Sequence, residues 1–83
     1  MNIKMQAQLN DVWDLVLYIR EDNPEYPFIL TTLNKETNKS YWDMAMEDEN
    51  IPAGGLAISN NPHIAQRAFM EKLTFFKQLF IFR

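Results

Sequence analysis

The chain offers few residues that could do chemistry. It has a single histidine, His63, with Ser59 and Ser40 as the available hydroxyl partners, and it has no cysteine. A catalytic histidine needs a nucleophile or a carboxylate within hydrogen-bond reach, and any small protein has Ser–His pairs of this kind. We therefore interpret His63 as a surface residue and predict no catalytic residue. The same composition argues against zinc, which takes mostly histidine and cysteine ligands.

The densest group of functional atoms is acidic: Asp43, Glu47, Asp48 and Glu49. Carboxylate oxygens bind Mg²⁺ or Ca²⁺, but these residues lack the spacing and the glycine of an EF-hand. We interpret them as solvated turn charges and predict no metal and no cofactor. A metal-dependent hydrolase or nuclease that uses this cluster together with Lys72 is kept as an alternative.

The glycine pair Gly54–Gly55 precedes a predicted helix, which is where many proteins bind phosphate. A phosphate loop requires a lysine directly at the helix start, and the next lysine in this chain is Lys72. The pair is therefore predicted to form a turn in which glycine relieves backbone strain.

Lys72 itself falls near the middle of the apolar side of the predicted C-terminal helix. A lysine in that position extends along its stem to reach water, or it pairs with a carboxylate. We expect the first arrangement, and we keep a pair with Asp14 or Asp43 as the sharper alternative.

Period-two alternation of apolar and polar residues predicts a strand-rich first part of the chain. Residues 12–20 fit a strand better than the alternative helix. The expected strands cover residues 2–10, 12–20, 28–34 and 40–47, with a short fifth strand or an extended connection at 56–59.

A long amphipathic helix is predicted for residues 61–80. Asparagine and serine precede Pro62, which suits the first helical position. The apolar side of the helix is broad and consists of Ile64, Ala65, Ala68, Phe69, Leu73, Phe75, Phe76, Leu79 and Phe80. The chain is therefore predicted to be one α+β domain over residues 1–83, strand-rich over 1–58. Its small antiparallel meander of three to five strands is followed by one C-terminal helix packed on one face.

Composition and charge limit the classes of partner. The chain has 83 residues, is 47% hydrophobic and 13% aromatic, and has a formal net charge of −3. Residues 10–49 carry a net charge of −7, whereas residues 50–83 carry +3. An acidic chain is a poor phosphate binder, so we expect no direct nucleic-acid binding. We see no targeting segment and no apolar run near the ~20 residues of a membrane helix, and we expect a cytoplasmic protein without membrane contact.

No motif maps onto a known family. In size and composition alone, the chain resembles the short, acidic, cysteine-free accessory proteins of phages and mobile elements, among them anti-CRISPR proteins. That resemblance implies a non-enzymatic protein-binding module that acts as an inhibitor of a partner with a basic surface. The candidate interaction surface combines acidic turns with neighbouring aromatic residues, and it consists of Glu21, Asp22, Glu25, Tyr26, Tyr41, Trp42, Asp43, Glu47, Asp48 and Glu49. A structural homodimer, joined through the C-terminal aromatics of the helix or through a sheet edge, is the alternative.

Overall fold

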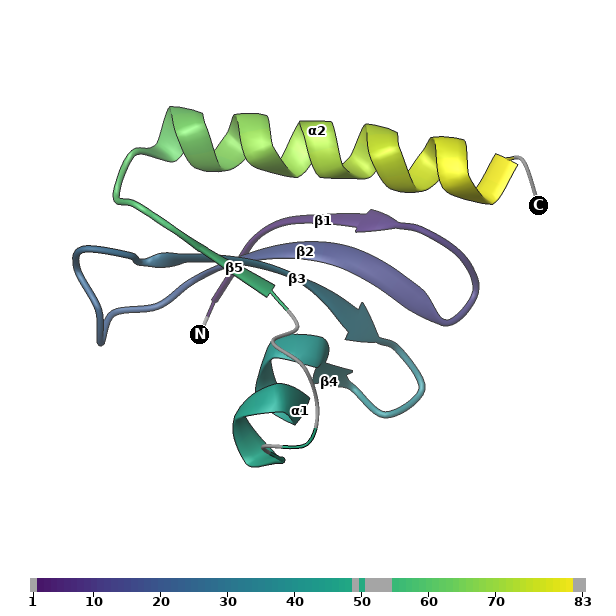
Figure 1. Ribbon diagram of the computed structural model, residues 1–83, viewed down its shortest axis with the longest axis horizontal. Coiled ribbons are helices and arrows are strands. Elements are labelled where there is room, and N and C mark those ends of the chain that lie inside the picture. Colours follow the sequence, from purple (N-terminus) through teal and green to yellow (C-terminus); the bar gives the residue numbers. More distant parts are fainter. Residues whose placement is uncertain (1, 49, 51–54, 82–83) are drawn as a thin grey trace.

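The computed structural model describes residues 2–48, 50 and 55–81. In chain order its elements are β1 (Asn2–Gln8), β2 (Trp13–Ile19), β3 (Phe28–Asn34), β4 (Lys39–Ser40), α1 (Tyr41–Glu47), β5 (Gly55–Ile58) and α2 (Pro62–Ile81). The predicted α+β class, the antiparallel meander and the long C-terminal helix packed on the sheet are confirmed (Figure 1).

The sheet is a meander of β1, β2, β3 and β4, with β5 added to β3. The β1–β2 turn is held by Asn10, whose Oδ1 accepts hydrogen bonds from the backbone N–H groups of Val12 and Trp13, each at 2.8 Å. Residues 14–19 pair with β1 on one side and residues 13–19 pair with β3 on the other, so the strand interpretation of this segment is correct.

Both faces of the sheet are apolar at its centre, which explains the continuous apolar run in β2. The face covered by α2, here called the upper face, buries Leu15 and Leu17 against the helix. On the opposite, lower face Val16 and Tyr18 pack with Trp42 of α1. Burying one large apolar side chain contributes about 1.5–3 kcal/mol, so the central strands anchor the fold from both sides.

The prediction of a strand over residues 40–47 is wrong, because most of this segment forms α1. Ser40 ends β4 and caps the helix, and its Oγ accepts a hydrogen bond from the backbone N–H of Asp43 at 3.0 Å. Asp43 also places a negative charge in the first turn, where the helix dipole favours it. Alternation of Trp42 with methionine resembled a strand, but Met46 is 75% exposed in the helix.

The helix α2 starts where the sequence predicted. Asn61 is the capping residue, since its Oδ1 accepts from the backbone N–H groups of His63 at 3.0 Å and Ile64 at 3.4 Å. The helix then runs along the upper face of the sheet (Figure 1).

The outer strand β1 is irregular. Its register with β2 shifts between Ile3 and Met5, and the intervening residue, Lys4, is exposed. The strand therefore bends at a charged residue near its start.

One ion pair ties three strands together. Asp14 in β2 is buried, and its Oδ1 lies 3.2 Å from the Nζ of Lys35, just beyond β3. Its Oδ2 accepts a hydrogen bond from the amide of Gln6 in β1 at 2.7 Å. Lys35 also donates to the backbone oxygen of Asn10 at 2.9 Å.

Replacing Lys35 with methionine tests this clamp. The substitution leaves a buried carboxylate without its cation, so the free energy of unfolding should fall by about 1–3 kcal/mol. Lys39→Met is the matched control, because the Lys39–Glu47 pair is exposed and should contribute less than about 1 kcal/mol. Urea unfolding followed by circular dichroism measures both. Equal losses would show that Asp14 does not depend on Lys35.

Candidate functional site

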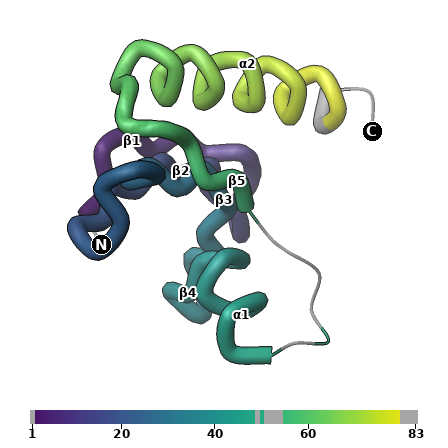
Figure 2. The backbone as a smooth tube through the Cα atoms, turned by 60° about the vertical axis from the view of Figure 1, so that its left-hand side comes forward, coloured from purple at the N-terminus to yellow at the C-terminus, as the bar shows by residue number. Residues whose placement is uncertain are grey.

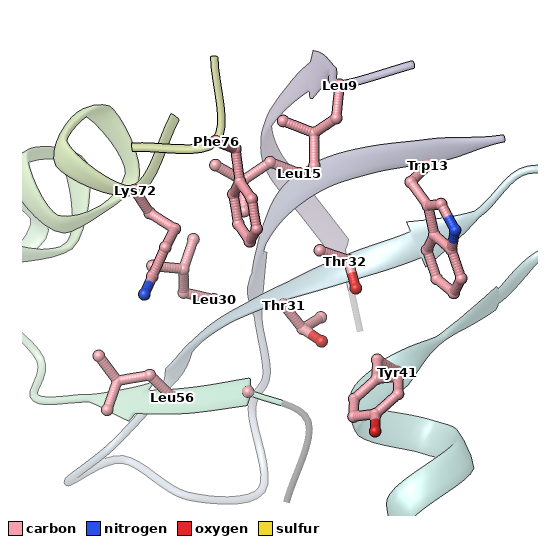
Figure 3. Close-up of a pocket in the computed structure, with 11 residues that line it drawn as sticks. Leu9, Trp13, Leu15, Leu30, Thr31, Thr32, Tyr41, Leu56, Lys72 and Phe76 are labelled. Carbon is pink, nitrogen blue, oxygen red and sulfur yellow. The ribbon is translucent and has the colours of Figure 1, made fainter. Parts of the chain in front are cut away.

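A groove of about 610 Å³ opens on the upper face, between α2 and the edge of the sheet (Figure 3). Its lining comes from β2, β3, β5, α2, the β1–β2 connection and the first residue of α1, and consists of Leu9, Trp13, Leu15, Leu30, Thr31, Thr32, Tyr41, Gly55, Leu56, Lys72 and Phe76. Its volume lies within the ~300–1,000 Å³ range of ligand-binding pockets.

The groove is bounded by a division in the sheet. Along β3, β5 pairs with residues 28–31 and β4 pairs with Leu33 and Asn34. Neither short strand pairs with Thr32, which lies between them. The chain turns from β4 into α1 at this point, so Tyr41 lines the groove while the next residue, Trp42, packs against the lower face.

Gly55 allows Trp42 to lie close to the sheet. A Cβ atom on Gly55 would come within 2.8 Å of the Trp42 ring and 2.9 Å of the Leu30 carbonyl oxygen. The sequence predicted a turn at the glycine pair, whereas the structure places Gly55 at the start of β5; Gly54 lies outside the described residues. Glycine is required at position 55 by this close approach.

The chemistry of the groove is mostly apolar. Four of its lining side chains are uncharged and carry a polar group, namely Trp13, Thr31, Thr32 and Tyr41, and Lys72 brings a positive charge to its side. The Lys72 ammonium lies 5.5 Å from the centre of the Phe75 ring. Figure 3 shows Phe76 and Lys72 descending from α2 toward the sheet. Such a surface can receive an apolar or aromatic group.

Lys72 extends along its stem to solvent, which is the first of the two arrangements expected from the sequence. Its side chain is exposed, as the snorkelling arrangement requires. The alternative pair with Asp14 is wrong, because that carboxylate pairs with Lys35 and lies on the lower face. Asp43 also faces the lower side, where its charge acts on Tyr18.

The residues of the predicted interaction surface lie in two separate regions of the structure. Glu21, Asp22, Glu25 and Tyr26 are exposed in the β2–β3 turn, at one end of the sheet, whereas α1 lies beneath the lower face (Figure 2). Arg20 connects them, since its Nε donates to the Tyr26 backbone oxygen at 3.0 Å and its guanidinium lies 5.8 Å from the Trp42 ring.

The acidic residues of α1 and of its C-cap form the second region. Asp43, Glu47 and Asp48 are exposed, and Glu47 pairs with Lys39 at 3.0 Å. Glu49 lies outside the described residues. Within the described ranges, no three acidic or histidine side chains gather as a metal ion would need.

The other residues singled out in the sequence are located as follows. His63 is exposed in the first turn of α2, as expected for a surface residue. Tyr41 joins the groove, and Trp42 is half-buried on the lower face, where it is part of the core.

Sequence reasoning missed most of the groove. Leu9, Trp13 and Thr32 read as ordinary strand residues, and no local pattern marks them. Two signals were available: Tyr41 was among the candidate interaction residues, and the charge of Lys72 on an apolar helix side indicates a position at the edge of the core.

Comparison with known proteins finds no match to a family model, to a curated protein or to a solved structure. In the part of the chain that the structure describes, no helix combines the length and the apolar character needed to cross a membrane.

Gly55→Ala tests the close packing beside the groove. The added methyl group displaces Trp42 or the β3 backbone, so we expect a loss of about 1–3 kcal/mol in the free energy of unfolding. In a Trp42→Leu background the same substitution should cost less, because one of the two obstructing groups is gone. Thermal and urea unfolding of the four proteins provide the cycle, and an unchanged cost would refute the contact.

Tyr18 provides a test of pH dependence. Burial raises the pKa of its phenol above the usual value, and the negative charge of Asp43 raises it further. As the pH rises, the phenol of the unfolded chain is deprotonated first, near pH 10. The contribution of Tyr18 to the free energy of unfolding is therefore fully present below that pH and is lost as the pH rises through the pKa of the folded protein. Against Tyr18→Phe, the wild type should lose stability only above about pH 10. Parallel stability curves up to pH 11 or so would contradict this account.

Proposed function

We propose that the protein is a non-enzymatic protein-binding module whose groove receives an apolar or aromatic side chain of its partner. The observation that carries this proposal is the groove itself, a mostly apolar hollow with four uncharged polar side chains and a single lysine among its lining residues. Buried aromatic anchors in such hollows dominate the energy of many protein interfaces.

The acidic residues of α1, which lie beneath the lower face of the sheet, favour a partner that also carries positive charge. Tyr41 lines the groove and begins α1, which then carries Asp43 and Glu47 on its exposed surface. Negative charges at the rim of an interface speed association with a positive surface and set its salt dependence. A partner with an apolar anchor for the groove and a basic surface that reaches past Tyr41 to α1 fits both features, and a module of this size would inhibit that partner by covering its surface.

Capture from an extract of the native host, compared between groove variants, tests the proposal. Thr32→Trp fills the groove from its floor and should weaken binding of the captured protein about tenfold or more. Thr74→Trp is the matched control, since Thr74 is exposed on α2 away from the groove lining. Equal recovery of the partner by both variants would sink the proposal.

Trp13 provides a direct reading of groove occupancy. The chain has two tryptophans, and Trp42 packs on the opposite face. In a Trp42→Phe variant, the captured partner should shift or quench the emission of Trp13.

Reversing the charge of Glu47 and Asp48 to lysine should slow association and flatten its salt dependence while leaving the Trp13 response at saturation intact.

A further inference from the structure

One side of the groove carries a positive charge that pairs with no carboxylate of the described residues. Lys72 is the only charged side chain among the described lining residues, and none of them is acidic. Glu71, which is adjacent to Lys72 in the sequence, pairs with Arg67 at 3.3 Å. None of the ion pairs between described residues includes Lys72. The Lys72 ammonium is therefore available to an anion that enters the groove.

A contact with an aromatic ring restrains this ammonium at the side of the groove. Its nitrogen lies 5.5 Å from the centre of the Phe75 ring, which is within the ~6 Å over which a ring attracts a cation. A side chain that is already restrained loses less conformational freedom when it pairs with a ligand. The contact with Phe75 therefore favours binding of an anion at this side.

The rest of the groove suits an aromatic ligand. Trp13, Tyr41 and Phe76 bring aromatic rings to the lining, which aliphatic side chains complete. Figure 3 shows Trp13 and Tyr41 on the side of the groove opposite Lys72. Contacts between aromatic rings stabilise a complex beyond the effect of the area that they bury. A ligand that spans the groove thus has its aromatic body toward these rings and its anionic end at Lys72.

The size of the groove identifies the kind of ligand. Its volume of about 610 Å³ is larger than one side chain needs and suits a small organic molecule. Sites for such molecules are mostly apolar, with a few polar groups that orient the ligand. We propose that the groove binds a small aromatic carboxylic acid whose carboxylate pairs with Lys72. The same groove serves the proposed protein partner, but binding of the acid does not depend on that partner.

Calorimetric titration of the full chain with naphthylacetate tests this pairing, and naphthylacetamide is the uncharged counterpart with the same aromatic body. At pH 7 the acid is ionised, and its dissociation constant should be about 1 mM or lower. Because Lys72 is exposed, the acid should bind about fivefold more tightly than the amide. Lys72→Met should remove this preference. Lys77→Met is the matched control, since Lys77 is exposed on α2 outside the groove lining and should leave the preference intact.

Heteronuclear NMR locates the bound acid. The indole N–H of Trp13 should shift on titration, whereas that of Trp42 on the lower face is the internal reference. Circular dichroism verifies that both lysine variants are folded.

Three results would overturn the proposal: no binding of the acid at about 1 mM, equal dissociation constants for acid and amide, or a preference for the acid that survives Lys72→Met. A shift of Trp42 without one of Trp13 would overturn it as well. The proposed protein partner is decided separately, because capture by Thr32→Trp uses an extract and these titrations use the purified chain alone.

Discussion

The outer edge of β3 is divided between β5 and β4, and this division determines the local geometry of the molecule. Since neither short strand pairs with Thr32, the sheet has a break where the chain passes from β4 into α1. Tyr41 and Trp42, adjacent in sequence, consequently serve opposite faces: one lines the groove, and the other closes the lower core. Gly55 follows from the same constraint, because Trp42 must approach the start of β5 closely.

The two faces of the sheet therefore present different chemistry. On the lower face, α1 exposes carboxylates and Trp42 fills the core. On the upper face, one helix covers the centre of a sheet that is wider than the helix, which leaves the groove along one side of α2 (Figure 3). The proposed partner contact uses apolar surface that a single α2 leaves exposed, and it borders on Lys72.

The sequence predicted the elements whose signals are local. Alternation in β1 and β2 and the capping of α2 by Asn61 depend on neighbours along the chain, so they could be recognised without a structure. The strand predicted over 40–47 failed for a local reason too, since Ser40 and Asp43 form a capped helix start that outweighs a short alternating pattern. A half-buried Trp42 is compatible with a strand as well as with a helix at this position.

The candidate site could not be predicted in the same way. The groove depends on which strands share an edge of β3, and that pairing joins residues far apart in sequence. Leu9, Trp13 and Thr32 meet only through it. Lys72 was recognisable because a charge on an apolar stripe is improbable inside a core, and it lies at the side of the groove. The acidic residues were found by composition, but the structure divides them between the β2–β3 turn and α1.

The bend in β1 has a consequence for solubility. A regular outer strand exposes a row of unpaired amides and carbonyls, which is a template for edge-to-edge aggregation. The register shift between Ile3 and Met5, with Lys4 exposed at the bend, interrupts that template with a twist and a charge. At the other edge, the described residues of β5 are Gly55–Ile58. Pairing of the β1 edge with another chain is thus disfavoured by the shape and the charge of β1.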